Sequence, residues 1–154
     1  VSEVHGMSQR GGSVVTYVKY GDKVYSPIID RGEADLILAF EMLEAMRALP
    51  YLKKGGKMIA NTQKMNPMPV ITGAMEYPKN IEEKLSAKIN LQAVDALSLA
   101  EKAGTIKAVN VVLIGLLAKS MDVDKNVWID VIKETVPEKF LDVNIKAFEL
   151  GYEL

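Results

Sequence analysis

Cysteine is absent from the 154 residues, and histidine occurs once. Without cysteine the chain can form no disulfide, no thiolate zinc site and no cysteine-ligated iron–sulfur cluster, and it offers no thiol nucleophile. A single histidine is too few for a zinc site and supports no convincing serine–histidine–aspartate arrangement. If the protein carries out redox chemistry, its electrons must therefore pass through a cofactor or a partner.

The sequence also lacks a long hydrophobic run and an excess of charge of either sign. Lys and Arg number 19 and Asp and Glu number 20, so the net charge is -1, whereas a nucleic-acid-binding protein usually carries a basic excess or stripe. No apolar run is long enough to span a bilayer, and no signal-peptide pattern opens the chain. We therefore expect a cytoplasmic protein with no nucleic-acid or membrane partner. The length suits one domain.

The stretch HGMSQRGG, from His5 to Gly12, places polar side chains and three glycines directly before an apolar segment. Flexible backbone of this kind can direct several N–H groups at one anion, and Arg10 can add a bidentate clamp. His5 can change charge near neutral pH. The alternative is a tight turn before a strand, with Arg10 paired to a nearby acid. The glycine spacing fits neither a dinucleotide fingerprint nor a P-loop, so it indicates no nucleotide class.

Residues 13–26 predict a β-hairpin, because β-branched and aromatic residues flank a turn at Gly21-Asp22. Its strands are expected at about 13–20 and 23–26. The next apolar run, Ala34–Phe40, has no polar alternation, which is typical of a strand buried on both faces of a parallel sheet.

A helix and a second strand follow that run. Apolar residues recur at helical spacing after Glu41, and Pro50 is expected to end the helix. Gly55-Gly56 is predicted to turn the chain into a strand at 57–62. Strand–helix–strand units of this kind form parallel sheets with right-handed crossovers, so the fold class is α/β.

The remaining residues predict one more strand and a helical end. The turn-rich segment 63–80 predicts an extended loop with a short strand at Val70-Ile71. A short helix at 81–88 and a strand ending near Asp95 come next. Helices are expected at 96–104, 107–120, 124–136 and 138–151.

Asn61 lies at the carboxyl end of a predicted central strand, the edge at which open α/β sheets bind ligands. The alternative, which the sequence alone favours, is an asparagine that forms its own turn. Acidic residues at strand ends are open to a metal-ligand role, but we interpret them as helix caps and solvated turns; they are Glu33, Asp35, Glu41 and Asp95.

Two asparagines, Asn110 and Asn144, lie beside apolar helix positions and predict structural hydrogen bonds rather than ligand contacts. The chain has 8 methionines, several of them between Met58 and Met75. Core filling is the favoured interpretation of these methionines, and an adaptable surface for a partner chain is the alternative.

Four stretches that together cover nearly the whole chain occur in a characteristic order. They are EVHGMSQRGGSVVTYVKYGDKVYSPII, GEADLILAFEMLEAMRALPYLKKGGKMIAN, AEKAGTIKAVNVVLIGLLAKSM and PEKFLDVNIKAFELGYE. Together they resemble the gamma domain of the 2-oxoacid:ferredoxin oxidoreductases, which is the pyruvate ferredoxin/flavodoxin oxidoreductase family. Within that family the likeness is greatest to the beta subunits of the indolepyruvate ferredoxin oxidoreductases.

The resemblance implies a fold and a reaction. The implied fold is a three-layer α/β/α sandwich with a mostly parallel sheet and a helical C-terminal third. Residues 1–154 would form one gamma-type domain that lacks the strand and glycine-rich turn with which the family normally begins. The implied reaction is oxidative decarboxylation of a 2-oxoacid, with indolepyruvate or another aryl pyruvate expected, to an acyl-CoA with ferredoxin as electron acceptor.

The resemblance also implies where the chemistry is carried. Thiamine diphosphate and the iron–sulfur clusters would belong to a partner alpha subunit, coenzyme A would be the co-substrate, and this chain would hold no metal and no catalytic residue of its own. The residues expected to face the substrate and coenzyme A region are Glu3, His5, Ser8, Gln9, Arg10, Gly11, Gly12 and Asn61. Two other functions stay open, namely a stand-alone module that binds coenzyme A or a nucleotide, and a purely structural subunit.

Overall fold

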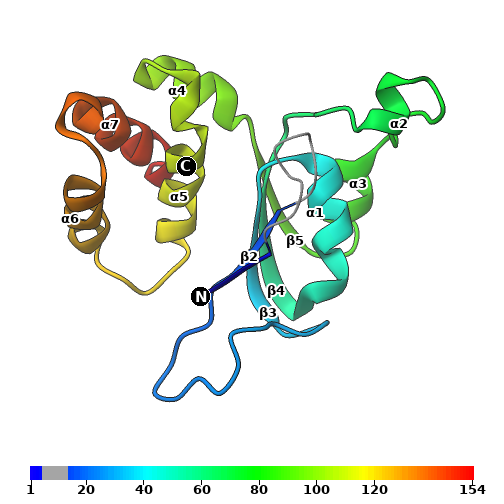
Figure 1. The fold of residues 1–154 in the computed structure, drawn as a ribbon, viewed down its shortest axis with the longest axis horizontal. Coiled ribbons are helices and arrows are strands. Elements are labelled where there is room, and N and C mark those ends of the chain that lie inside the picture. Colours follow the sequence, from blue (N-terminus) through cyan, green and yellow to red (C-terminus); the bar gives the residue numbers. More distant parts are fainter. Residues whose placement is uncertain (5–13) are drawn as a thin grey trace.

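A three-stranded parallel sheet forms the centre of the protein (Figure 1). The computed structural model describes residues 1–4 and 14–154. The strands of the sheet are β3 (Ala34–Ala39), β4 (Leu52–Asn61) and β5 (Asn90–Val94), and their order is β3-β4-β5. The predicted parallel sheet is therefore confirmed.

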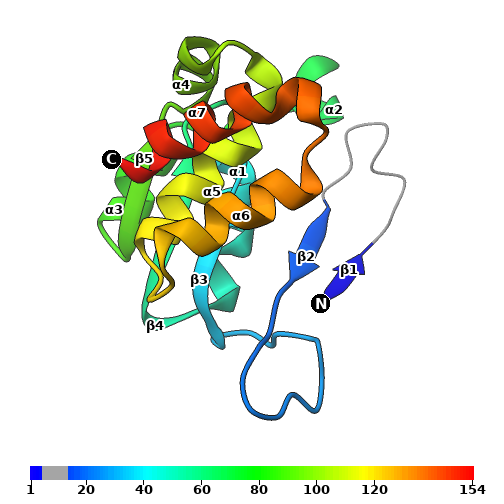
Figure 2. The same ribbon diagram turned by 90° about the vertical axis from the view of Figure 1, so that its left-hand side faces the viewer.

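Helices cover both faces of this sheet and make three layers (Figure 1). One face carries α1 (Met42–Ala48) and α3 (Ile81–Ser86), and the short helix α2 (Met68–Ile71) lies beyond them. The other face carries the helical C-terminal part, which Figure 2 shows facing the viewer. Its helices are α4 (Ala96–Ala103), α5 (Val109–Lys119), α6 (Lys125–Thr135) and α7 (Leu141–Tyr152). The three-layer α/β/α sandwich is thus as expected. Short 3-10 turns connect the longer elements; they are η2 (Leu49–Tyr51), η3 (Ile106–Ala108) and η4 (Glu138–Phe140).

The alternation of side chains along β4 divides the apolar core into two parts. Met58 and Ala60 are fully buried against α1 and α3, whereas Ile59 is fully buried against the C-terminal helices. Successive residues of a strand point to opposite faces, so a strand covered by helices on both faces needs apolar residues without alternation. This requirement explains the continuous apolar run of β3 as well.

Most helices begin and end near the residues predicted from the sequence. Glu41 and Asp95 are the N-caps of α1 and α4, where their carboxylates accept hydrogen bonds from the backbone N–H groups of Glu44 and Ser98. Gly104 ends α4. The interpretation of these two acids as helix caps is confirmed, and Asn144 likewise donates a structural hydrogen bond to the carbonyl oxygen of Phe140 at 2.8 Å.

The predicted hairpin is wrong. The strand β2 spans only Val15–Tyr17 and pairs antiparallel with β1 (Ser2–Val4), and residues 18–33 contain no strand. Apolar side chains of this segment, such as Tyr20 and Tyr25, are exposed. Alternating apolar residues favour a strand only where a core covers one face, and here the upstream strand β1 pairs with β2 instead.

Two details of the 50–80 region also differ from the prediction. Val70 and Ile71 belong to the helix α2, because the prolines Pro67 and Pro69 begin a helical turn rather than a strand. Gly55 and Gly56 lie inside β4 and not before it, at a break in the β3–β4 register. Gly55 has φ +82°, and a Cβ on Gly56 would lie 3.0 Å from the carbonyl oxygen of Asp35, so this irregular stretch favours glycine at both positions.

Candidate functional site

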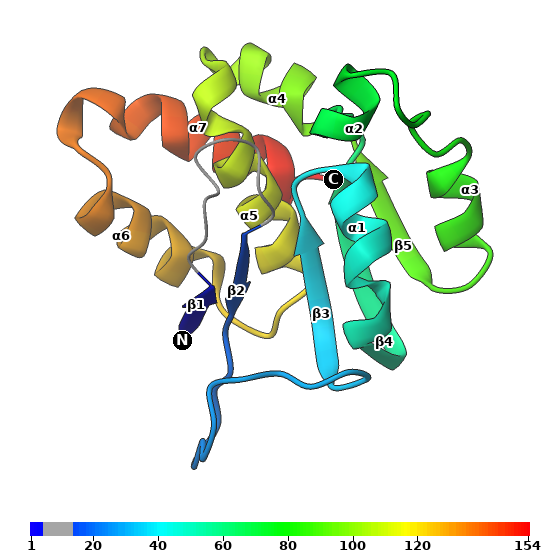
Figure 3. The ribbon, with the colours of Figure 1, turned by 45° about the vertical axis from the view of Figure 1, so that its right-hand side comes forward.

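The carboxyl ends of β3, β4 and β5 meet at one edge of the sheet, where Figure 3 shows the arrowheads of β3 and β5. In open α/β folds this edge is the usual ligand-binding side. Asn61 lies here, as predicted, at the end of β4. Glu3 lies in β1, in the separate two-stranded ribbon, and is exposed. The other six predicted site residues lie outside the described residues; they are His5, Ser8, Gln9, Arg10, Gly11 and Gly12.

Asn61 joins all three strand ends through a buried side chain. Its Nδ2 donates to the carbonyl oxygen of Phe40 after β3 at 3.3 Å and to Oε1 of Gln63 at 3.3 Å. Its Oδ1 accepts from the backbone N–H of Ala96, which begins α4 after β5, at 3.2 Å. The side chain is fully buried and both ends of its amide are used. Asn61 therefore positions the edge of the sheet by its amide.

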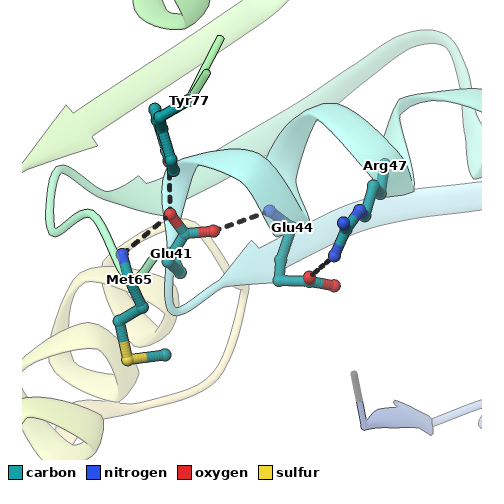
Figure 4. A network of polar contacts seen from close by, with 5 residues as sticks. All are labelled: Glu41, Glu44, Arg47, Met65 and Tyr77. Atoms are coloured by element: carbon teal, nitrogen blue, oxygen red, sulfur yellow. Dashed lines mark hydrogen bonds and ion pairs between the residues drawn. The ribbon is translucent and has the colours of Figure 1, made fainter. Parts of the chain in front are cut away.

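Glu41 is a second organising residue at this edge, and the residue is only 3% exposed. Oε2 accepts the N-cap hydrogen bond from the backbone N–H of Glu44 at 3.0 Å. Oε1 accepts from the backbone N–H of Met65 at 3.2 Å and from the hydroxyl of Tyr77. Figure 4 shows these contacts, together with the ion pair between Glu44 and Arg47 one turn along α1. Three donors thus compensate the burial of this carboxylate.

The two residues that share Oε1 belong to opposite ends of the loop between β4 and α3. Met65 lies near the start of this loop and Tyr77 near its end, so a single carboxylate holds both ends against α1. The backbone N–H of Met42 adds a hydrogen bond to the carbonyl oxygen of Gln63 at 3.3 Å. The sequence identified Glu41 as a cap, but no local pattern pointed to Tyr77, because the contact spans 36 positions.

A surface cavity of about 520 Å³ opens beside this loop. Its wall includes the charged residues Lys64, Glu82 and Glu83, together with Met42, Thr62, Pro78, Asn80, Ile81 and Ser86. Lys64 brings a cation to this wall and lies 6.0 Å from the ring centroid of Tyr77. The cavity wall therefore combines one cation with two carboxylates, amide and hydroxyl groups and apolar side chains, so its charge does not favour an anion.

The acidic side chains considered as metal ligands do not converge. Asp35 forms an ion pair with Lys53, and the pKa of the Asp95 carboxyl is lowered by hydrogen bonds from the side chain and backbone of Ser98. Among residues 1–4 and 14–154, no three His, Asp or Glu side chains lie close enough together to hold a metal ion. Over the same residues, no helix has both the length and the apolar character needed to cross a membrane.

The hydroxyl of Tyr77 should make the protein sensitive to alkaline pH. Its pKa is raised above the ordinary value of 10.0, chiefly by burial and then by the hydrogen bond to Glu41. A raised pKa in the folded state means that the stabilising contribution is complete below about pH 10 and is lost as the pH rises further. We expect the free energy of unfolding to fall less steeply above about pH 10 in Tyr77→Phe than in the unmodified protein. Urea unfolding at a series of pH values measures this, and the exposed Tyr25→Phe is the matched control. If the free energy of unfolding fell equally steeply with pH in the unmodified protein and in Tyr77→Phe, the hydrogen bond between Tyr77 and Glu41 would be contradicted.

All 154 residues match the family described as pyruvate ferredoxin/flavodoxin oxidoreductase. An indolepyruvate oxidoreductase subunit IorB from Thermococcus kodakarensis is 45% identical, over 98% of this chain and 78% of that protein. The proteins of the same name from Pyrococcus horikoshii and Archaeoglobus fulgidus are 44% and 40% identical, again over 98% of this chain. The chain therefore belongs to the pyruvate ferredoxin/flavodoxin oxidoreductase family, and the resemblance inferred from its motifs is confirmed.

Two solved structures share the fold. The gamma subunit of a keto/oxoacid ferredoxin oxidoreductase from Geobacter sulfurreducens aligns with a TM-score of 0.64 and 23% identity, over 99% of this chain and 76% of that one. A 2-oxoglutarate:ferredoxin oxidoreductase from Magnetococcus marinus aligns with a TM-score of 0.60 and 17% identity, over 86% of this chain and 21% of that one. That enzyme is described with 2-oxoglutarate, coenzyme A and succinyl-CoA bound. The second alignment shows that this fold also occurs as one part of a much longer chain.

Proposed function

We propose that the chain is the cofactor-free subunit of an indolepyruvate, or more broadly aryl pyruvate, ferredoxin oxidoreductase. The observation that carries this proposal is the 36–45% identity to four relatives named indolepyruvate oxidoreductase subunit IorB, over nearly the whole chain. In the proposed reaction a 2-oxoacid and coenzyme A give an acyl-CoA, carbon dioxide and a proton, and two electrons pass to ferredoxin. This chain is then one component of an enzyme whose reacting centre it completes.

The proposed partner is an alpha subunit that carries thiamine diphosphate and the iron–sulfur clusters. The absence of cysteine supports this division, because these 154 residues offer no thiolate for a cluster. Bound thiamine diphosphate supplies a nucleophilic carbon that attacks the keto group and accepts the electrons of decarboxylation. The donor set of this chain does not fit a cluster, so no electron-transfer step is assigned to its residues.

The part of this chain in the reaction is to position substrate groups. In the proposal the segment from Glu3 to Gly12 borders the substrate and coenzyme A region, and Arg10 or Gln9 contacts a substrate carboxylate or a coenzyme A phosphate. The other polar groups of the segment, at Ser8 and the backbone of Gly11-Gly12, add hydrogen bonds, and His5 orients the segment or exchanges a proton. Asn61 contributes to the proposed region indirectly, because its side chain holds the three strand ends together.

The proposal is tested by producing the chain together with a thiamine-diphosphate subunit that has a cysteine-rich ferredoxin-like region. The expected result is a complex that contains both proteins and reduces ferredoxin with indolepyruvate and coenzyme A, while neither subunit alone does so. A chain that stays a stable monomer, binds coenzyme A by itself and ignores the partner would instead identify a stand-alone binding module.

The anion contact of Arg10 has its own test within that complex. Loss of a charge-assisted hydrogen bond costs about 1.5–3 kcal/mol, so Arg10→Ala should raise KM for the 2-oxoacid or for coenzyme A by about 10- to 100-fold. The matched control is Arg31→Ala, at an exposed position before β3. Unchanged KM values for both substrates would refute the contact. If the complex with Arg10→Ala forms normally but turns over slowly, the chain is not a purely structural subunit.

A further inference from the structure

The loop between β4 and α3 contains a segment of unusual composition. From Met65 to Met75 the sequence is MNPMPVITGAM, which has no charged residue. Its large apolar side chains point to solvent, since Met65, Met68, Ile71 and Met75 are 58–65% exposed. In Figure 1 the helix α2 within this segment stands away from the body of the protein. Met42 and Met58 fill the core, which agrees with the favoured interpretation of the methionines. The methionines of this segment form an exposed apolar surface, so the alternative, a surface for a partner chain, stays a prediction for them.

The segment is exposed, yet both of its ends are fixed. Just before and just after its exposed part, the backbone N–H of Met65 and the hydroxyl of Tyr77 donate to the same carboxylate oxygen of Glu41. Inside the segment, Thr72 and Met75 close turns on the carbonyl oxygens of Met68 and Pro69. Fixing a loop in this way costs conformational entropy, and burying a carboxylate costs desolvation energy. The result is an apolar surface whose conformation is already restrained in the free protein. Such preorganisation reduces the entropic cost of association.

We propose that the segment Met65–Met75 docks into an apolar face of the thiamine-diphosphate-bearing partner subunit, and that Glu41 and Tyr77 form the latch that holds it ready. This inference rests on the proposed function, which supplies the partner. The centre of a protein–protein interface is poor in charged residues and rich in methionine and aromatic residues, and methionine adapts its shape to the opposing surface. The composition of the segment matches such a centre.

The position of the segment favours this partner. The segment leaves the sheet directly after Asn61 and lies at the end of the sheet where β3 and β5 terminate (Figure 3). The cavity beside Lys64 opens at the same edge. A subunit that brings its reacting centre to this edge comes close to the loop that leaves β4 there. The other exposed apolar pair on a helix, Val127 and Val131 of α6, lies in the opposite layer and among the charged side chains of Asp130, Lys133 and Glu134.

The test is the dissociation constant between the two purified full-length subunits, measured by titration calorimetry. The double variant Met68→Lys/Ile71→Lys places two charges at the centre of the proposed interface, so we expect the dissociation constant to rise roughly 30-fold or more. At saturating partner the kcat should return to that of the unmodified protein, because the segment docks and does not react. The matched control is Val127→Lys/Val131→Lys, which makes the same kind of change at two exposed positions of α6 and should alter the dissociation constant less than about threefold.

The latch is tested separately by Tyr77→Phe, which removes one hydroxyl and leaves the exposed surface unchanged. We expect a smaller rise in the dissociation constant, about fivefold. Without the hydrogen bond the free loop is less ordered, so more conformational entropy is lost when it binds. An unchanged value for Tyr77→Phe would overturn the role of the latch. An unchanged value for Met68→Lys/Ile71→Lys would overturn the docking surface while leaving the proposed function intact.

Two further outcomes distinguish this inference from a dimer interface and from failure of the proposed function. If the unmodified chain forms dimers that Met68→Lys/Ile71→Lys abolishes, while both bind the partner equally, the surface serves a second copy of the chain and the proposed occupant is wrong. If the unmodified chain neither binds the partner nor supports turnover, the proposed function itself fails, and the docking inference fails with it.

Discussion

Replacing Gly151 by alanine is expected to lower the free energy of unfolding by about 3 kcal/mol or more. Gly151 of α7 lies against α5, and a Cβ at this position would lie 1.9 Å from the carbonyl oxygen of Val112. Gly115 of α5 makes the reciprocal contact, because its Cβ would lie 2.1 Å from the carbonyl oxygen of Phe148. The obstructing atoms are backbone, so the two helices must move apart to admit a methyl group. That movement would open the core around Val112 and Phe148, both of which are fully buried.

Helix propensity works in the opposite direction and is too weak to compensate. Alanine in a helix interior is favoured over glycine by about 1 kcal/mol, whereas the overlap with backbone forces a repacking of the core. Urea unfolding of Gly151→Ala and Gly115→Ala measures the balance. Asn110→Ala, at an exposed position of α5, is the control that gains propensity without an overlap. Higher stability for either glycine variant than for the unmodified protein would show that the helices are not packed this closely.

The fold was largely predictable because its strongest signals are local. The continuous apolar runs of β3 and of α5, the stop at Pro50 and the glycine after α4 each depend on residues within one element. The hairpin failed for the complementary reason. Whether residues 18–26 form a strand depends on a partner strand and a covering core, and the segment has neither in the described part of the chain.

Two residues that organise the edge of the sheet could be placed from the sequence, but their hydrogen-bond partners could not. The position of Asn61 at a strand end followed from periodicity, and Glu41 was identified as a helix cap. What the sequence could not reveal is that Asn61 reaches Ala96 across 35 positions and that Glu41 reaches Tyr77 across 36. Buried polar groups must find partners, but the rule does not say where along the chain those partners lie. The long-range hydrogen bonds that assemble the edge of the sheet therefore appear only in the structure.

Replacing Asn61 by aspartate should be the most damaging nearly isosteric change at this edge. The change replaces Nδ2, which donates to the carbonyl oxygen of Phe40 and to Oε1 of Gln63, by an oxygen that can only repel them when the carboxyl is ionised. A fully buried, unpaired carboxylate is strongly unfavourable, so we expect a loss of about 3 kcal/mol or more at pH 7.

The pH dependence of Asn61→Asp identifies the cause of that loss. Burial disfavours the ionised form and raises the pKa of the new carboxyl above the ordinary value of about 3.9. The loss is therefore complete above the raised pKa and shrinks as the pH falls toward about 4, where the protonated carboxyl can again donate one hydrogen bond. Urea unfolding at several pH values measures this, with the exposed Asn126→Asp as control, where a carboxylate in the first turn of α6 is tolerated. A loss that did not vary with pH would mean that the new side chain escapes to solvent, and the three strand ends would then not depend on the amide of Asn61.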